Sequence, residues 1–214
     1  MLFVDREREA RRIAKELAGG HHVIVTGPYG IGRTSLLRKL SESTRDRYRF
    51  VFLDFERPVA EMCRFLFVEL FPRRGGKRKA AELRSSGVRF RIATWRPEDP
   101  RRHVLVLDNV ARLSHRKLGL IGDLAASKRY ALVAIVESFL PAAEMERIRG
   151  RLAPAPVIRL GRLSDERARE YFALASQSYG MGWTRDRIAA AAAGAGGYPL
   201  GMWEAVTRER QRRS

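Results

Sequence analysis

The chain has 214 residues and a mass of 24.4 kDa, which allows one main hydrophobic core with a small appendage but excludes two full domains. Its 45% hydrophobic and 31% charged residues exclude a largely disordered chain. The longest strongly apolar stretch, residues 131–136, is far shorter than the roughly 20 residues of a membrane span. The start of the chain is too charged for a secretory signal, so we expect a soluble, cytoplasmic protein with no membrane contact.

The net charge of +18 indicates a polyanionic partner. Residues 73–102 contain eleven Lys or Arg residues against three Asp or Glu residues, so this segment carries nearly half of the excess charge. A basic proteome or a heat-adapted, arginine-rich surface is the alternative explanation. The clustering favours a nucleic-acid partner. Cys63, the single cysteine, lies in an apolar run and is expected in the core, where it can form no internal disulfide.

The first third of the chain alternates between helical and strand patterns. Residues 5–18 have apolar residues at helical spacing and predict an amphipathic helix. Residues 22–26 predict a short buried strand that leads into a glycine-rich loop, and residues 34–40 predict a leucine-rich helix behind this loop. A second strand is expected at residues 48–55 and a largely buried helix at 59–71.

The basic segment at residues 73–102 interrupts this alternation and is interpreted as an insertion. It contains a short predicted helix at 80–84. Residues 88–92, Val-Arg-Phe-Arg-Ile, alternate between apolar and basic side chains and predict an exposed strand.

Three more apolar strands are predicted at residues 103–108, 130–136 and 157–160, with a helix at 118–125. Strands that alternate with helices are typical of a parallel sheet covered on both faces. We therefore predict an α/β fold with a parallel five-stranded P-loop NTPase sheet, helices on both faces and a small C-terminal helical lid. The expected domains are a core at 1–163 and a lid at 164–214, whose helices begin at Ser164, Thr184 and Pro199.

The segment Gly27–Thr34 has the pattern of a phosphate-binding loop. Glycines let backbone N–H groups converge on an anion, and the following helix adds its dipole. The general pattern Gly-x4-Gly-Lys-[Ser/Thr] is met except that Arg33 stands at the lysine position, while Thr34 has the hydroxyl that would bind Mg²⁺. The expected nucleotide-binding residues of this loop are Gly27, Pro28, Tyr29, Gly30, Ile31, Gly32, Arg33, Thr34 and Ser35.

Asp108 ends the apolar strand 103–108 and is predicted to bind Mg²⁺ together with Thr34. The next position, where a second acid commonly orients the attacking water, holds Asn109, which cannot accept a proton. Asp108 and Asn109 are the candidate catalytic residues. Arg33 also weakens the case for hydrolysis, because its planar fork is wider than an ammonium group. ATPase activity is therefore left open.

The segments 3–9, 25–37, 104–109 and 196–200 occur in a familiar order. Together they resemble the archaeal ATPases of the STAND group, relatives of AAA+ proteins and of origin-recognition initiators. The resemblance covers most of the chain except the basic segment, and it implies ATP or ADP with Mg²⁺ as ligands. Those initiators carry a winged helix after the lid, for which the sequence leaves too few residues.

The resemblance also implies roles for residues outside the loop. Phe3, Val4 and Arg6 would lie at the adenine, or alternatively would staple and cap the first helix. Pro199 would contact the nucleotide from the lid, or only start a helix. Either Glu137 or Ser138 would sense the γ-phosphate. Arg151 lies where relatives carry an arginine finger for a neighbouring subunit, which would imply self-association; the alternative is a surface arginine.

Two functions remain open from the sequence. The first is an ATP-binding, weakly hydrolysing switch that contacts DNA or a nucleoprotein partner, with Phe90 and Trp95 as stacking groups or as packing residues. The second is a degenerate, non-hydrolysing interaction module. A small-molecule kinase is disfavoured by the C-terminal helices. The expected nucleic-acid contacts are Arg73, Arg74, Lys77, Arg78 and Lys79.

Overall fold

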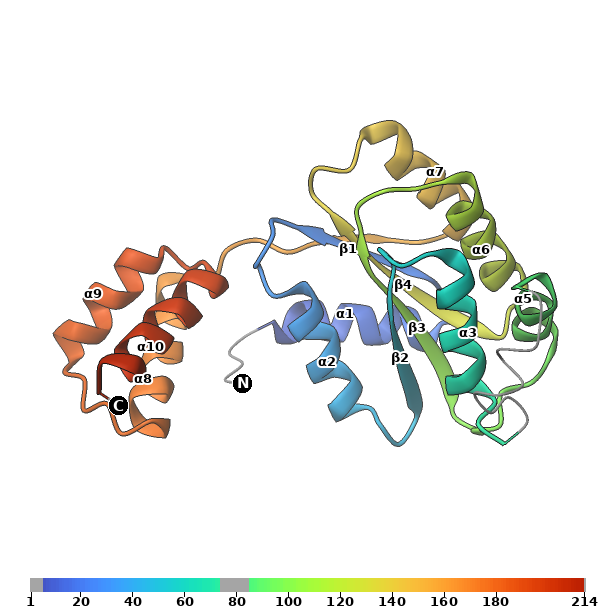
Figure 1. Cartoon of the computed structure of the whole chain (residues 1–214). Coiled ribbons are helices and arrows are strands. Elements are labelled where there is room, and N and C mark those ends of the chain that lie inside the picture. Colours follow the sequence, from blue (N-terminus) through green and yellow to red (C-terminus); the bar gives the residue numbers. More distant parts are fainter. Residues whose placement is uncertain (1–5, 74–84, 214) are drawn as a thin grey trace.

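The structure is a computed structural model, and it describes residues 6–73 and 85–213 (Figure 1). The helices are α1 (Glu7–Ala18), α2 (Arg33–Ser43), α3 (Val59–Leu70), α5 (Ser85–Thr94), α6 (His115–Ala126), α7 (Ala142–Leu152), α8 (Asp165–Ser178), α9 (Arg185–Ala195) and α10 (Pro199–Arg213). The strands are β1 (Val23–Gly27), β2 (Tyr48–Asp54), β3 (Arg102–Val110), β4 (Tyr130–Glu137) and β5 (Val157–Arg159).

The five strands form one sheet in the order β2-β3-β4-β1-β5, and every pair is parallel. The predicted five-stranded parallel α/β sheet is thus confirmed. Parallel neighbours need a crossover connection, and the intervening helices provide it. Because the carboxyl ends of parallel strands meet at one edge, this order brings the ends of β1, β3 and β4 together.

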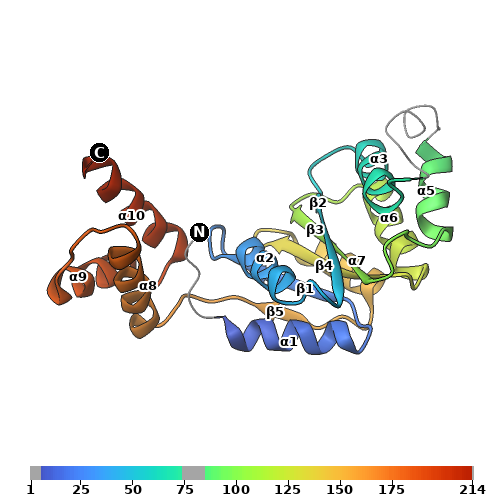
Figure 2. The ribbon, with the colours of Figure 1, turned by 90° about the horizontal axis from the view of Figure 1, so that it is seen from below.

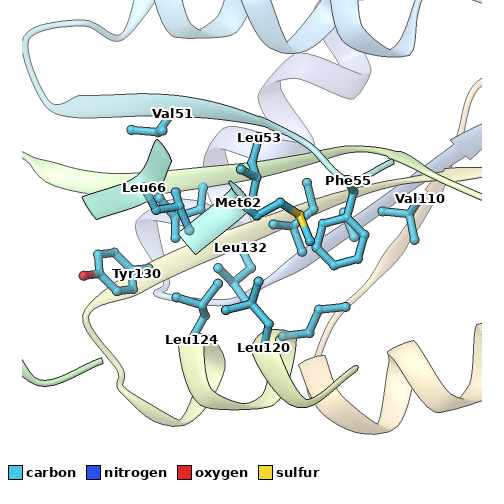
Figure 3. Packing of buried hydrophobic residues seen from close by; sticks show 14 of the residues in the cluster. Val51, Leu53, Phe55, Met62, Leu66, Val110, Leu120, Leu124, Tyr130 and Leu132 are labelled. Carbon is cyan, nitrogen blue, oxygen red and sulfur yellow. The ribbon is translucent and has the colours of Figure 1, made fainter. Parts of the chain in front are cut away.

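Both faces of the sheet are buried, and alternate residues of each strand supply them. Leu105 and Leu107 of β3 pack with α3, α5, α6 and α7, whereas Val104 and Val106 pack with α1 and α2. Figure 3 shows the first of these clusters, in which Met62 and Leu120 meet the side chains of the sheet. Successive side chains of a strand point to opposite faces of the sheet, so one continuous apolar strand contributes to two separate cores.

The helices α8, α9 and α10, which we call the lid, have a hydrophobic cluster of their own. Figures 1 and 2 show the lid set to one side of the sheet, at the opposite end of the molecule from α5. The side chains of Ser164 and Thr184 accept hydrogen bonds from the backbone N–H groups of Arg167 and Arg187, so both predicted caps are present. Among the described helices, none has the length and apolar character that crossing a membrane would require.

The predicted strand at residues 88–92 is wrong, because these residues lie in helix α5. Val88 and Ile92 are four residues apart, so on a helix they share one face, and both are fully buried. Trp95 follows the helix and packs against Phe67, while Phe90 is 66% exposed. A five-residue alternating pattern could not distinguish these two arrangements. The helix predicted at 80–84 lies outside the described residues, and α7 was not foreseen.

Candidate functional site

The phosphate loop, residues 27–34, connects β1 to α2. Gly27, Gly30 and Gly32 have φ values of 154°, 74° and 93°, a region that side chains disfavour. A Cβ at Gly27 would also lie 2.7 Å from the carbonyl oxygen of Leu160. The helix behind the loop begins at Arg33, so its free N–H groups and positive dipole end lie at the loop. These are the features of an anion-binding site.

Strand register brings the polar strand ends to this loop. Gly27 at the end of β1 pairs with Glu137 at the end of β4, and Asp54 at the end of β2 pairs with Asp108 of β3. The pairing of β3 with β4 shifts between Leu107 and Val110, so Asp108 lies at an irregularity of the sheet edge.

Thr34 and Asp108, the two residues predicted to bind Mg²⁺, are in direct contact. The hydroxyl of Thr34 lies 3.1 Å from both carboxylate oxygens of Asp108. Burial raises the pKa of Asp108, although the hydroxyl of Thr34 and the backbone N–H of Asn109 counteract part of this effect. A hydroxyl and a carboxylate are the hard oxygen donors that Mg²⁺ prefers, so the donor set fits this ion. Among the described residues, no three His, Cys, Asp or Glu residues gather into a cage for a metal.

Arg33 points away from solvent and binds the end of β4. Its Nη2 donates to both carboxylate oxygens of Glu137, at 2.7 and 2.6 Å, and its Nη1 donates to the carbonyl oxygen of Val136 at 2.8 Å. Arg33 is only 6% exposed and Glu137 only 8%. Of the two residues proposed for the end of this strand, Glu137 lines the pocket and Ser138 is exposed. The sequence alone had not connected Arg33 with Glu137.

Asn109 follows Asp108 in a left-handed conformation with φ 60°. Its amide nitrogen lies 3.5 Å from a carboxylate oxygen of Asp54, across the ends of β2 and β3. Asn109 lines the same pocket as Asp108. Its predicted role in orienting a water remains a prediction.

Arg6 is buried at the start of α1 and joins two parts of the site. Its Nη2 donates to the carbonyl oxygens of Ile31 at 3.2 Å and of Gly161 at 2.6 Å, and its Nη1 pairs with Glu9. Arg6 therefore ties the phosphate loop to the connection between β5 and the lid. Phe3 and Val4, the other residues predicted at the base, lie outside the described residues.

The lid contacts the phosphate loop directly at the start of α10. The backbone N–H of Leu200 donates to the carbonyl oxygen of Gly30 at 3.2 Å. The hydroxyl of Tyr198 donates to the carbonyl oxygen of Tyr29. A Cβ at Gly30 would lie 2.7 Å from the Cβ of Leu200. The sequence predicted a ligand contact for Pro199 only, so the contacts of Tyr198 and Leu200 with the loop were not predicted.

A pocket of about 550 Å³ lies between the loop and the lid. The core contributes the polar residues Thr34 and Asp108, whereas the lid contributes an apolar wall that includes Met202 and Val206. Pro199 also lines the pocket, and its contact with a nucleotide remains a prediction. The apolar wall was not foreseen, because the same residues also have the pattern of a helix packed in its own core.

Two further predicted groups lie away from this pocket. Arg73 is exposed after α3, while Arg74, Lys77, Arg78 and Lys79 lie outside the described residues. Part of the positive charge in the basic segment is paired, since Arg89 binds Asp123 of α6. Arg151 is exposed on α7 and lies beside Gly122 of α6, so any action on a neighbouring subunit stays a prediction.

Residues 17–140 match the model of a protein family described as the AAA domain, which covers more than half of the chain. The chain belongs to this family. The phosphate loop, the Thr34–Asp108 pair and strands β1 to β4 lie within the matched residues, whereas β5 lies beyond them. No curated protein matches the sequence significantly.

Solved structures share the fold of this AAA domain. Aeropyrum pernix Orc1, in complex with DNA, is 14% identical with a TM-score of 0.69 over 100% of this chain and 62% of its own. The Thermotoga maritima RuvB Holliday junction branch migration motor is 17% identical, with a TM-score of 0.61 over 96% and 62%. Cdc6p from Pyrobaculum aerophilum is 18% identical, with a TM-score of 0.60 over 98% and 64%. The chain thus spans less than two thirds of each, and at these identities the likeness concerns the fold alone.

Proposed function

We propose that this AAA domain binds ATP or ADP with Mg²⁺ between the phosphate loop and the lid and acts as a nucleotide-dependent switch. The observation that carries this proposal is the contact between Thr34 and Asp108 at the start of α2, behind a loop of positive-φ glycines. A loop built this way suits phosphate, and its two oxygen donors suit the accompanying ion. The lid closes the same pocket, so ligand contacts there can bias the lid position.

Different residues would bind the phosphates, the metal ion and the base. Backbone N–H groups of the loop and of the first turn of α2 would hold phosphates, and Thr34 and Asp108 would hold Mg²⁺, which neutralises phosphate charge when bound. The apolar wall with Met202 and Val206 would receive the base. Asn109 can orient a water but cannot take its proton, so we expect slow hydrolysis.

A partner on the basic segment is a second part of the proposal. Helix α5, which belongs to the basic segment, lies at the opposite end of the molecule from the lid, so a partner at α5 would leave the pocket accessible (Figure 2). The solved Orc1 structure is a complex with DNA, and RuvB is a Holliday junction branch migration motor, so nucleic acid is the first partner to test. Membership of the STAND group, an archaeal source and self-association through Arg151 are proposed on the sequence resemblance only.

The decisive experiment is a calorimetric titration of the purified chain with ADP and with ATP, each with and without Mg²⁺. Nucleotide binding that Mg²⁺ strengthens, together with a rise in melting temperature, is the expected result. Absence of binding to either nucleotide would refute the proposal and leave the fold intact. Binding to a DNA duplex that weakens as salt rises would support the partner proposal, and salt-insensitive binding would contradict it.

The alternative is a non-hydrolysing interaction module, and the buried Arg33–Glu137 pair favours it. In that case nucleotide, if bound, would stabilise the fold without turnover. Phosphate release measured with and without DNA separates the two functions, because only the switch should release phosphate faster than a Thr34→Ala variant.

A further inference from the structure

The positive charge at the lysine position of the phosphate loop is already neutralised inside the protein. Among the described residues, the Arg33 guanidinium makes three hydrogen bonds, all to β4: two to the carboxylate of Glu137 and one to the carbonyl of Val136. Both charged residues are more than nine-tenths buried. The pair therefore adds no net charge to the loop, where a lysine would add one positive charge.

Release of Arg33 toward a ligand would be costly. If the guanidinium turned to a phosphate, the carboxylate of Glu137 would remain buried without its cation. Nη2 of Arg33 donates to both carboxylate oxygens of Glu137 and Nη1 donates to the carbonyl oxygen of Val136, so a turn toward a phosphate would break three buried hydrogen bonds. We therefore expect Arg33 to stay bound to Glu137 when the loop is filled.

Two other arginines line the pocket, but neither stands at the lysine position of the loop. Arg6 donates to two backbone carbonyls and to Glu9, and Arg210 of α10 stacks on the ring of Tyr179 at 4.2 Å and keeps its charge. Asp108 adds a carboxylate, which Mg²⁺ would balance. Glu137 lines the same pocket as the loop and its carboxylate binds Arg33, so this negative charge lies at the loop itself. Each further negative charge on a ligand in the loop therefore meets more repulsion than in a loop with a free lysine.

We propose that the Arg33–Glu137 pair makes this site selective for nucleoside diphosphates over nucleoside triphosphates. The inference rests on the proposed nucleotide-binding function and names the ligand state that this site prefers. A triphosphate carries one more negative charge than a diphosphate, and in this loop that charge lacks its usual cation.

The test is calorimetry of the intact chain with Mg²⁺ and either ADP or a non-hydrolysable ATP analogue. For the unaltered protein we expect ADP to bind on the order of tenfold more tightly. Glu137→Gln removes the negative charge but keeps an oxygen that can accept from Arg33. This variant should bind the triphosphate analogue about as well as ADP, so the affinity ratio falls toward one.

Two further variants make the result interpretable. Arg33→Lys combined with Glu137→Gln removes the buried pair as a unit and supplies a free ammonium, so it should favour the triphosphate analogue even where Glu137→Gln alone folds poorly. Glu146→Gln changes the net charge equally but lies exposed on α7, where Glu146 pairs with Arg149, and it should leave the ratio unchanged. Denaturation curves of all variants report whether each is folded.

Three results would overturn the inference. These are equal or tighter binding of the triphosphate analogue by the unaltered protein, an unchanged ratio in both Glu137 variants, and an equal shift in Glu146→Gln. If neither nucleotide binds any folded variant, the proposed nucleotide-binding function fails as well, so the two failures are distinguishable.

Discussion

Arg33 and Thr34 are consecutive residues at the start of one helix, yet they make two very different sites. Thr34 is partly exposed and hydrogen-bonds Asp108, in an arrangement suited to a metal ion. Arg33 is buried and its charge is matched by Glu137. The Thr34 side of the loop, which we call the open side, is thus arranged for a ligand. On the Arg33 side, which we call the closed side, the charged group is already bound to another part of the protein. A loop pattern can therefore be complete in its backbone and oxygen donors and still lack its cation.

The largest expected effect is on the closed side. Glu137→Ala leaves the guanidinium of Arg33 buried with only the carbonyl of Val136 as acceptor, so we expect the free energy of unfolding to fall by about 3 kcal/mol. Thr34→Ala removes one partly buried hydrogen bond and should cost about 1 kcal/mol. Urea denaturation of both variants measures the two losses. Equal losses of unfolding free energy in the two variants would contradict the contrast between the buried Arg33 pair and the partly exposed Thr34 contact.

The contact between the loop and the lid should be the next most sensitive. Gly30→Ala places a side chain at φ 74° and against Leu200, so we expect a loss of about 2 kcal/mol and weaker nucleotide binding. Gly150→Ala is the matched control, because Gly150 lies in α7 and an added Cβ would meet no described atom within 4 Å beyond its chain neighbours and its own helix backbone. That change should stabilise the protein by about 0.5 kcal/mol. Thermal unfolding measures both, and a harmless Gly30→Ala would argue against close contact between the lid and the loop.

The open side is probed through Mg²⁺. Asp108→Asn keeps the size of the side chain but replaces one carboxylate oxygen by an amide, so we expect the Mg²⁺-dependent part of the nucleotide affinity to fall about tenfold. Folding should be little affected, because the amide can still accept from Thr34. Calorimetry at several Mg²⁺ concentrations measures this dependence, and an Mg²⁺ response equal to that of the unaltered protein would remove Asp108 from the metal site.

The smallest expected effect is that of Tyr198→Phe. It removes only the hydroxyl that donates to the carbonyl oxygen of Tyr29, which water can solvate in its place. A loss of about 0.5 kcal/mol in stability is expected, with the affinity for ADP nearly unchanged. A large loss of affinity would show that this hydrogen bond, rather than the contact of Leu200 with Gly30, holds the lid to the loop.

The sheet and the loop could be predicted because their signals are local. Five short apolar runs separated by helical patterns are enough to specify a parallel sheet, and the glycines of residues 27–32 follow the first run directly. The sequence also singled out Thr34 at the start of a helix and Asp108 at the end of a strand, and the structure shows that their side chains touch.

The remaining features depend on contacts that the sequence does not encode locally. Arg33 and Glu137 are 104 positions apart, and only the register of β1 with β4 shows that they meet. Val88 and Ile92 fit a strand and a helix equally well, and burial against α3 and α6 decides for the helix. The segment of α10 that closes the pocket was likewise indistinguishable from a helix packed only within the lid.

The contact at Gly30 has a mechanical consequence. Helix α10 starts at Pro199, beside the phosphate loop, and its fifteen residues extend about 22 Å from there (Figure 1). A tilt of about 10° at its base would therefore displace its far end by about 4 Å. A small rotation at the start of α10, beside the loop, would therefore become a much larger displacement at its far end. A fluorescent probe attached near that far end could measure this displacement.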